Sequence, residues 1–352
     1  MAARQQQVCT NIYKTNKINS MTDLTTRFAG LTLQNPLIIG SSGLTNHPDN
    51  IAELEKQGAA AVVLKSLFEE QIMAETEETI RAAYQHNLIY TQKSDAFDYI
   101  DMSVKEDTIA QYLELIRESK KRVSIPVIAS VNCVTASEWT SFVNKIQTAG
   151  ADAIELNIAI TPTDVTQTIG AREKIHNIIF ERVKTIARIP VIVKLSPYFT
   201  NPALVINSLS EAGADGLVLF NRYYNPDFDI ETMTEKSANT YSRPDEYSYS
   251  LRWIAIMSGK VGTGLSAATG IHNTETIIKQ LLAGAQTVQL VSAIYKEGPG
   301  YIQTLLKELE QWMDQKGFNQ IDQFRARLCT TGSINQGIFD RIQFMKYFSN
   351  IG

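Results

Sequence analysis

QGAAAVVL at residues 57–64 is the first of four related stretches that decide the fold, the others being AGADAIEL (149–156), AGADGLVL (212–219) and AGAQTVQL (283–290). In each, a glycine suited to the end of a helix is followed at once by a short apolar run. Such runs are typical of parallel strands that are buried on both faces. The stretches therefore predict four junctions at which a helix ends and a buried strand begins.

A second type of strand lies between these stretches: NPLIIG (35–40), IPVIAS (125–130) and IPVIVK (189–194). Proline at the first position of a strand is tolerated, because its missing N–H is not needed there. A further strand is expected at 265–268. The four strands of the first type, the three of the second and this further strand make eight short strands.

Amphipathic patterns predict a helix after each strand. We expect helices at 49–57, 105–121, 137–149, 172–188, 202–212, 249–258, 274–283 and 300–315. Eight strand–helix units indicate an α/β protein with a TIM (β/α)8 barrel of about 250 residues plus insertions. The alternative is a doubly wound open sheet with a second domain, but the first turn reads GSSGLT (40–45) where such sheets usually carry G-x-G-x-x-G.

The length of 352 residues leaves room for additions to one barrel. We expect a flexible N-terminal tail at 1–20, then a single barrel domain at 21–352 with a C-terminal helical extension. Long loops follow strand 2 (68–103) and strand 6 (222–248). Both leave the C-terminal ends of strands, where barrel enzymes build their active sites. The second is rich in Tyr, Pro and Asp, and is interpreted as a cap over a planar ligand or as a surface insertion.

Composition limits the classes of partner. The chain has 44% hydrophobic and 20% charged residues and a net charge of -4, so no global field attracts nucleic acid. Three separated cysteines (Cys9, Cys133, Cys329) suit a reducing compartment, which favours the cytoplasm. The four histidines show no metal-ligand spacing, and no apolar stretch reaches the length of a membrane span. We expect a small-molecule substrate, no metal, no nucleic acid and no membrane contact.

Polar residues at the C-terminal ends of buried strands are the candidate site residues, because a buried strand has no structural need for them. They are Ser41, Ser42, Lys65, Ser66, Asn132, Asn157, Lys194, Asn221 and Arg222, and Gly43 follows the two serines after strand 1. Lys65 and Lys194 would both face the mouth of the barrel. Two cations there favour an anionic ligand, or a ligand that gains negative charge when it accepts electrons. The alternatives are structural salt bridges or a Schiff-base lysine.

Loops after strands 7 and 8 often bind phosphate in barrels. Here Gly270 allows a close backbone approach, Asn273 or Thr274 can cap the next helix, and Ser292 can complete a cradle. The alternative is that Gly270 serves only a turn.

The motifs in order resemble those of the class 1 dihydroorotate dehydrogenases. They are N-P (35–36), S-S-G (41–43), K-S (65–66), L-N (156–157), V-K-L-S-P (193–197), Asn221, T-G-I (269–271) and L-L-A-G-A-x-x-V-Q (281–289). The resemblance extends from Leu24 to about Tyr295. LFNRYYNPDFD (219–229) and LRWIAIMSG (251–259) resemble the dihydroorotate dehydrogenase-like branch most closely.

The resemblance implies FMN at the barrel mouth with a pyrimidine-like ring stacked on it. It implies flavin contacts from residues at the ends of the strands: Ser41, Ser42, Lys65, Ser66, Asn132, Asn157 and Lys194. It implies a phosphate grip by Gly270, Ile271, Val291 and Ser292, with Val291 and Thr269 each replacing a usual glycine. It also implies substrate contacts from Lys65, Asn157 and Asn221, while Arg222 is interpreted as a clamp for a carboxylate or as an anchor of the long loop.

Strand 4 departs from the family pattern. The family places a cysteine or serine base after this strand, but the chain reads N-I-A-I-T-P (157–162), with Ile160 at that position. Isoleucine cannot accept a proton. Thr161, Thr163 and Asp164 are weak candidates for a substitute base, and the base stays unassigned.

The resemblance implies an FMN-dependent oxidoreductase of pyrimidine biosynthesis that oxidises dihydroorotate, or a related reduced ring, and passes electrons to a soluble acceptor. Lys65 and Lys194 are its candidate catalytic side chains. Three alternatives stay open: an FMN oxidoreductase with another substrate, a lysine-dependent lyase or isomerase of a phosphorylated substrate, and a non-catalytic flavin-binding protein. A homodimer is also left open by the sequence.

Overall fold

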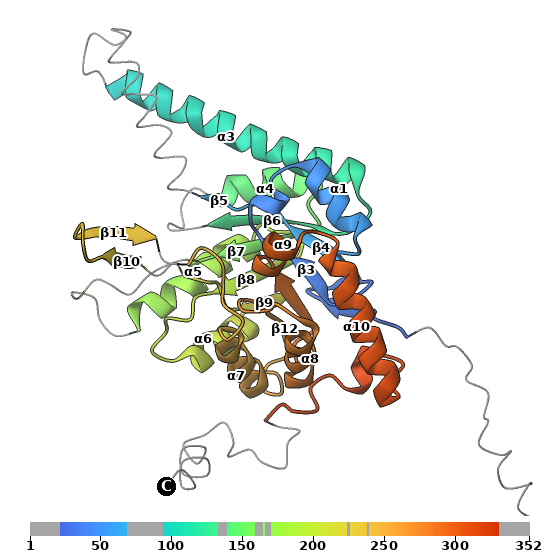
Figure 1. Cartoon of the computed structure of the whole chain (residues 1–352). Helices are drawn as coiled ribbons and strands as arrows, with labels where there is room; N and C mark the ends of the chain where they lie inside the picture. Colours follow the sequence, from blue (N-terminus) through green and yellow to red (C-terminus); the bar gives the residue numbers. More distant parts are fainter. Residues whose placement is uncertain are drawn as a thin grey trace, which may run out of the picture.

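Eight parallel strands lie at the centre of the molecule and close into a barrel (Figure 1). The structure is a computed structural model that describes residues 22–68, 94–132, 139–158, 165, 170–223, 226–237 and 239–330. The barrel strands are β3 (Leu37–Ile39), β4 (Ala61–Val63), β6 (Val127–Asn132), β7 (Ala153–Asn157), β8 (Val191–Leu195), β9 (Gly216–Leu219), β12 (Gly264–Ala267) and β13 (Thr287–Leu290). They pair in chain order, and β13 pairs with β3 to complete the circle. The predicted TIM barrel is confirmed.

Helices surround the barrel, one after each strand (Figure 1). They are α1 (Pro48–Lys56), α3 (Ser94–Arg122), α4 (Trp139–Ala149), α5 (Ala171–Lys184), α6 (Pro202–Glu211), α7 (Tyr247–Met257), α8 (Thr274–Ala283) and α10 (Tyr301–Lys316), with the short α9 (Ser292–Glu297) before α10. Their apolar faces and the outward faces of the strands share one large buried cluster. The core therefore lies between the helices and the barrel.

The four repeated glycines perform the predicted role. Gly58, Gly150, Gly213 and Gly284 have φ values of 99°, 100°, 90° and 118°. This left-handed region strains other residues. At Gly284 the space is also closed, since a Cβ there would collide with the side chain of Ser258.

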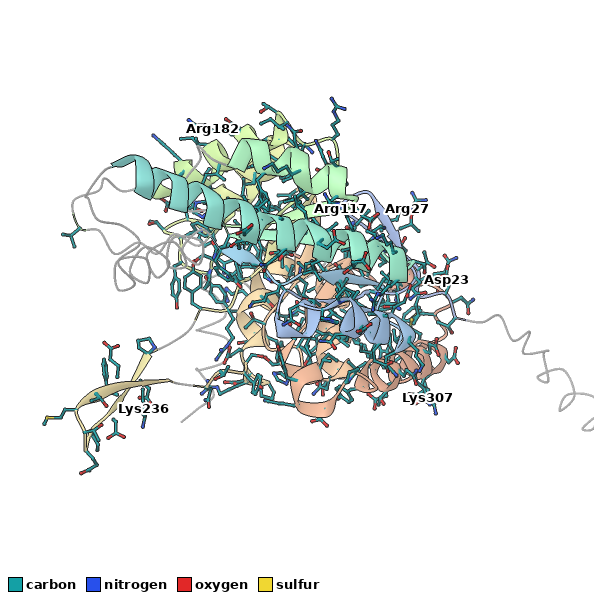
Figure 2. The ribbon with its side chains drawn as sticks, turned by 90° about the horizontal axis from the view of Figure 1, so that it is seen from above. Asp23, Arg27, Arg117, Arg182, Lys236 and Lys307 are labelled. Atoms are coloured by element: carbon teal, nitrogen blue, oxygen red, sulfur yellow. The ribbon has the colours of Figure 1, made fainter. Side chains whose placement is uncertain are left out.

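Both long segments contain regular structure that the sequence did not predict. The helix expected to begin at 105 begins at Ser94, so the expectation of a loop reaching to 103 was wrong for its last part. In the second segment β10 (Pro226–Asp229) and β11 (Thr234–Ser237) form an antiparallel hairpin. This hairpin, which carries Lys236, stands away from the barrel (Figure 2).

A second unpredicted hairpin closes the N-terminal end of the barrel. β1 (Thr26–Phe28) and β2 (Leu31–Leu33) pair across a turn at Ala29 and Gly30. Phe28 fills the space under the start of β9, where a Cβ on Gly216 would lie 2.7 Å from its ring. Phe28 and Leu33 join a cluster of inward-facing apolar residues. Because this end is filled with apolar side chains, the opposite end is the one available for a ligand.

The chain after α10 folds back over the outer helices. Amides of Ala326 and Leu328 donate hydrogen bonds to the carbonyls of Leu281 and Leu282 in α8. Among residues 317–330 the only helix is the short 3-10 turn η2 (Ile321–Gln323), and the rest of the predicted helical extension lies outside the described residues. Within the described ranges no helix has the length and apolar character needed to cross a bilayer.

Candidate active site

Alternation along the strands turns polar side chains into the mouth of the barrel. Asn132 at the end of β6 is paired in register with Asn157 at the end of β7, and Asn157 is paired with Lys194 in β8. All three side chains are more than nine-tenths buried. The structure therefore brings these predicted residues together on three neighbouring strands.

A cavity of about 300 Å³ opens at this end of the barrel. Its walls include seven of the predicted residues besides Arg222: Ser41, Lys194, Asn221, Gly270, Ile271, Val291 and Ser292. The other lining residues are Thr240, Ser242, Ala268, Thr269 and Gln289. Strand ends far apart in the sequence thus meet around one space, as the barrel predicts.

A chain of hydroxyl groups crosses the wall of this site. Oγ of Ser41 lies 3.0 Å from Oγ of Ser66 and accepts a hydrogen bond from the Ser66 amide. Oγ of Ser66 lies 2.7 Å from Oγ of Ser130 in β6. By contrast, Ser42 caps the 3-10 turn η1 (Gly43–Thr45), and Lys65 is exposed beside Ser66.

Two asparagines hold each other at the mouth, and a third has unused hydrogen-bonding capacity. Nδ2 of Asn221 donates to Oδ1 of Asn157 at 3.0 Å. Oδ1 of Asn132 is buried and has no hydrogen-bond partner among the described residues. An unsatisfied buried oxygen is unfavourable unless a ligand or water completes it.

Glu155 and Gln289 hold the side chain of Lys194 in a network inside the barrel, which the sequence analysis did not predict. Nζ of Lys194 donates to Oε1 of Gln289 at 2.7 Å and lies 3.5 Å from Oε1 of Glu155. Nε2 of Gln289 donates to Oε2 of Glu155 at 2.5 Å. The signal was present in the sequence, because Glu155 and Gln289 are polar residues inside runs of apolar strand residues.

The predicted phosphate end contains two basic side chains that the sequence analysis missed. The amide of Ser242 donates to Oγ of Ser292 at 3.0 Å, and Oγ of Ser242 lies 2.9 Å from Nε2 of His272. Nζ of Lys296 donates to the carbonyl of Ser242 at 3.4 Å. Burial and the charge of Lys296 lower the pKa of His272. Asn273 caps α8 as predicted.

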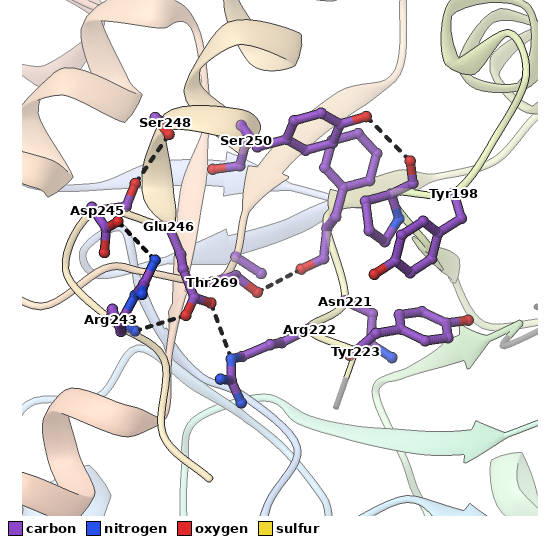
Figure 3. Close-up of a pocket in the computed structure, with 14 residues that line it drawn as sticks. Tyr198, Asn221, Arg222, Tyr223, Arg243, Asp245, Glu246, Ser248, Ser250 and Thr269 are labelled. Carbon is purple, nitrogen blue, oxygen red and sulfur yellow. Dashed lines mark hydrogen bonds and ion pairs between the residues drawn. The ribbon is translucent and has the colours of Figure 1, made fainter. Parts of the chain in front are cut away.

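Arg222 anchors the long segment after β9 (Figure 3). Its Nε donates to Glu246 at 3.0 Å, and its two terminal nitrogens donate to the carbonyls of Thr240 and Asn239 at 3.0 and 2.8 Å. The structure thus shows the anchoring role, while a contact with a substrate carboxylate stays a prediction. Beside Arg222 lies a second cavity of about 520 Å³, whose walls include Tyr198, Asn221 and Tyr223.

The residues at the position of the missing base lie outside the described residues. They are Ile160, Thr161, Thr163 and Asp164. Their roles stay predictions from the sequence.

Comparison with known proteins decides the family. The model of the family described as dihydroorotate dehydrogenase matches residues 23–313. The chain belongs to the dihydroorotate dehydrogenase family. Family membership makes it an oxidoreductase of the dihydroorotate dehydrogenase type, and enzymes of this family are generally flavin-dependent.

Curated relatives carry the name dihydroorotate dehydrogenase B (NAD(+)), catalytic subunit. The proteins from Thermoplasma volcanium and Thermoplasma acidophilum are each 27% identical to the chain, over 86% of the chain and 97% of their own length. The protein from Bacillus cytotoxicus is 30% identical over 59% of the chain and 68% of its own length. The predicted family is therefore confirmed, and the similarity to the Thermoplasma proteins covers most of the barrel.

The backbone at the predicted phosphate end accommodates Thr269, which the sequence analysis places at a usual glycine position of the family. Thr269 has φ of 72°. Its Oγ1 donates to the carbonyl of Phe220 at 2.9 Å. This bond helps to hold a conformation that is unfavourable by roughly 1 kcal/mol for a residue with a Cβ.

Proposed function

We propose that the chain is an FMN-dependent oxidoreductase that oxidises dihydroorotate, or a closely related reduced ring, to orotate or its counterpart at a CH–CH group. The observation that supports this best is the cavity at the barrel mouth. Its walls bring Ser41, Lys194 and Asn221 together with Gly270 and Ser292, which lie in the loops that are predicted to bind phosphate. The membership of the family supports the same class of reaction.

The residues present fit a flavin in size and in chemistry. The cavity of about 300 Å³ adjoins the one of about 520 Å³, and both are lined by Asn221, Arg222 and Thr269. Together they lie within the range of about 300 to 1,000 Å³ that is usual for ligand sites. Asn132 is not among the lining residues of either cavity, and in this proposal its unsatisfied Oδ1 would accept a hydrogen bond from a polar ligand group.

Each group at the mouth has a task in this proposal. When bound, FMN would supply the hydride acceptor. Lys194 would present its cation to the edge of the ring system, where the reduced form gathers negative charge. Asn157 and Asn221 would hold the substrate ring, and the backbone at Gly270, Ile271, Val291 and Ser292 would grip the phosphate.

The proton acceptor is the open part of the reaction. Ile160 cannot take the proton that an orthodox family member passes to cysteine or serine. We propose that Thr161, Thr163 or Asp164 takes this role if dihydroorotate is the substrate. A substrate whose proton leaves from nitrogen or oxygen would need no such base at position 160.

The structure argues against a Schiff-base lysine at position 194. A lysine nucleophile needs an amine that is free to attack a carbonyl. Nζ of Lys194 instead donates to Oε1 of Gln289 at 2.7 Å and lies 3.5 Å from the buried carboxylate of Glu155. The electron acceptor is proposed to be a soluble molecule, as the NAD(+) in the names of the relatives suggests for those proteins.

An anaerobic titration of the purified protein tests the proposal. We expect flavin absorption in the protein after incubation with FMN, and bleaching of that absorption by dihydroorotate. A protein that takes up no FMN would overturn the cofactor assignment. Bound FMN that is bleached only by other reduced rings would change the substrate, and bound FMN that no reduced ring bleaches would favour a non-catalytic flavin protein.

A further inference from the structure

Glu155 is a fully buried carboxylate in the centre of the barrel. It follows Ala153 by two residues in β7, so its side chain points into the barrel, as those of Ala153 and Asn157 do. Its exposed fraction is 0%. A buried carboxylate is strongly unfavourable unless charge and hydrogen bonds compensate it.

Compensation comes from two other strands of the barrel. Lys194 in the neighbouring strand β8 supplies the positive charge, and Gln289 in β13 lies between the two charged groups. Gln289 uses both ends of its amide: the N–H donates to Glu155, and the oxygen accepts from Lys194. The three side chains are exposed by 0%, 7% and 4%, so water does not replace these contacts.

Lys194 is the one charged member of this network that lines the cavity. Lys194 and Gln289 line the cavity at the mouth, whereas Glu155 is absent from its walls. The carboxylate therefore acts on any ligand through the lysine that it holds. This arrangement differs from a surface ion pair, because burial makes the interaction between the charges strong.

We propose that Glu155 is a positioning residue that, through Gln289, holds the Lys194 ammonium at the mouth of the barrel and offsets its charge there. The flavin ring would be the ligand exposed to the electrostatic field of Glu155 and Lys194, so this inference rests on the proposed function. The Lys194 ammonium would face the edge of the ring in both redox states, and the carboxylate behind it would offset part of its positive field.

Other titratable groups near the pair do not replace Glu155. Tyr112 of α3 contacts the backbone of Ser130 in β6, and burial raises its pKa, so it stays neutral. Arg222 lines the same cavity, and its Nε is paired with Glu246. Lys65 is exposed after β4. Among the described residues Glu155 thus supplies the negative charge beside Lys194.

Replacement of the carboxylate by its amide tests the inference in the FMN-loaded protein. Glu155→Gln keeps the shape and removes the negative charge. We expect a higher flavin midpoint potential and an affinity of the flavin for sulfite about tenfold higher than in the wild type.

Two further variants separate this effect from general damage. Ser266→Ala removes a buried hydroxyl from the inward face of β12 and should leave the midpoint potential unchanged. Glu155→Asp keeps the charge and should restore part of the wild-type potential. A midpoint potential of Glu155→Gln equal to that of the wild type would overturn the inference.

The apoprotein provides a test that does not depend on FMN. We expect Glu155→Gln and Lys194→Met each to lower the unfolding midpoint of the apoprotein, and the double variant to be more stable than the sum of the two losses predicts. Additive losses would overturn the pairing. If the wild type binds no FMN, the proposed function fails while this cycle still decides whether Glu155 and Lys194 are coupled.

Discussion

Nδ2 of Asn221 donates a hydrogen bond to Oδ1 of Asn157, and this bond joins the loop after β9 to the end of β7. The bond fixes the direction of both amides. With respect to the part of the chain that the structure describes, the N–H groups of Asn157 and the carbonyl oxygen of Asn221 are then available to a ligand. A ring with alternating acceptors and donors at its edge, such as a pyrimidine, matches this arrangement.

Asn221→Asp should weaken the binding of such a ring. A carboxylate cannot donate to Asn157, so the amide of Asn157 would have to turn and use an N–H group on the new carboxylate, and that N–H group would be lost to the ring. We expect the concentration of reduced ring needed to bleach half of the flavin to rise about tenfold to a hundredfold, with FMN content unchanged. Asn207→Asp on the outer helix α6 is the matched control and should leave this concentration as it is. Equal behaviour of the two variants would contradict the assignment.

Arg222→Lys should loosen the segment that Arg222 anchors. Lysine cannot form the three directed bonds to Glu246, Thr240 and Asn239. We expect faster hydrogen exchange at 239–246 and weaker FMN binding, because Thr240 and Ser242 line the cavity. Arg243→Lys, which changes an exposed pair with Asp245, is the control. Loss of substrate binding without faster exchange would favour the carboxylate-clamp interpretation.

The barrel could be predicted because its signals are local. A glycine at a helix end followed by an apolar run, as at Gly150, reports a junction without any knowledge of the rest of the fold. The hairpin β1–β2 was missed because its strands have only three residues each, although the Ala29–Gly30 turn was a usable signal. The polar network was missed because Glu155 and Gln289 are 134 residues apart, and only the closed barrel brings them together.

Gly284→Ala should destabilise the protein more than Gly213→Ala. Both glycines have positive φ, so each change introduces strain of about 1 kcal/mol. A Cβ at position 213 meets no atom within 4 Å, whereas one at 284 collides with Ser258. We therefore expect Gly213→Ala to lower the free energy of unfolding by about 1 kcal/mol and Gly284→Ala to lower it by at least about twice that amount. Denaturant unfolding measures both, and equal losses would show that helix α8 can shift away from Ser258.

His272 should make stability depend on pH. Burial and Lys296 lower its pKa in the folded protein from the ordinary value of 6.5. The unfolded chain then binds the proton more readily, so this contribution is present above about pH 6.5 and is lost as the pH falls. His272→Gln keeps a group able to contact Ser242 but does not titrate. We expect the free energy of unfolding of the wild type to fall more steeply below this pH than that of the variant, and parallel curves would argue against it.

Asn132→Leu should separate stability from cofactor binding. Oδ1 of Asn132 is buried without a hydrogen-bond partner among the described residues, so the apoprotein loses little when the amide is replaced by an apolar group of similar size. We expect the free energy of unfolding of the apoprotein to stay the same or rise. The affinity for FMN should fall about tenfold, because the ligand loses its buried acceptor. Isothermal titration of the two apoproteins with FMN, beside denaturant unfolding, measures both quantities. Equal affinities would show that Asn132 does not face the flavin, whereas a large loss of apoprotein stability would show that its amide has a structural task.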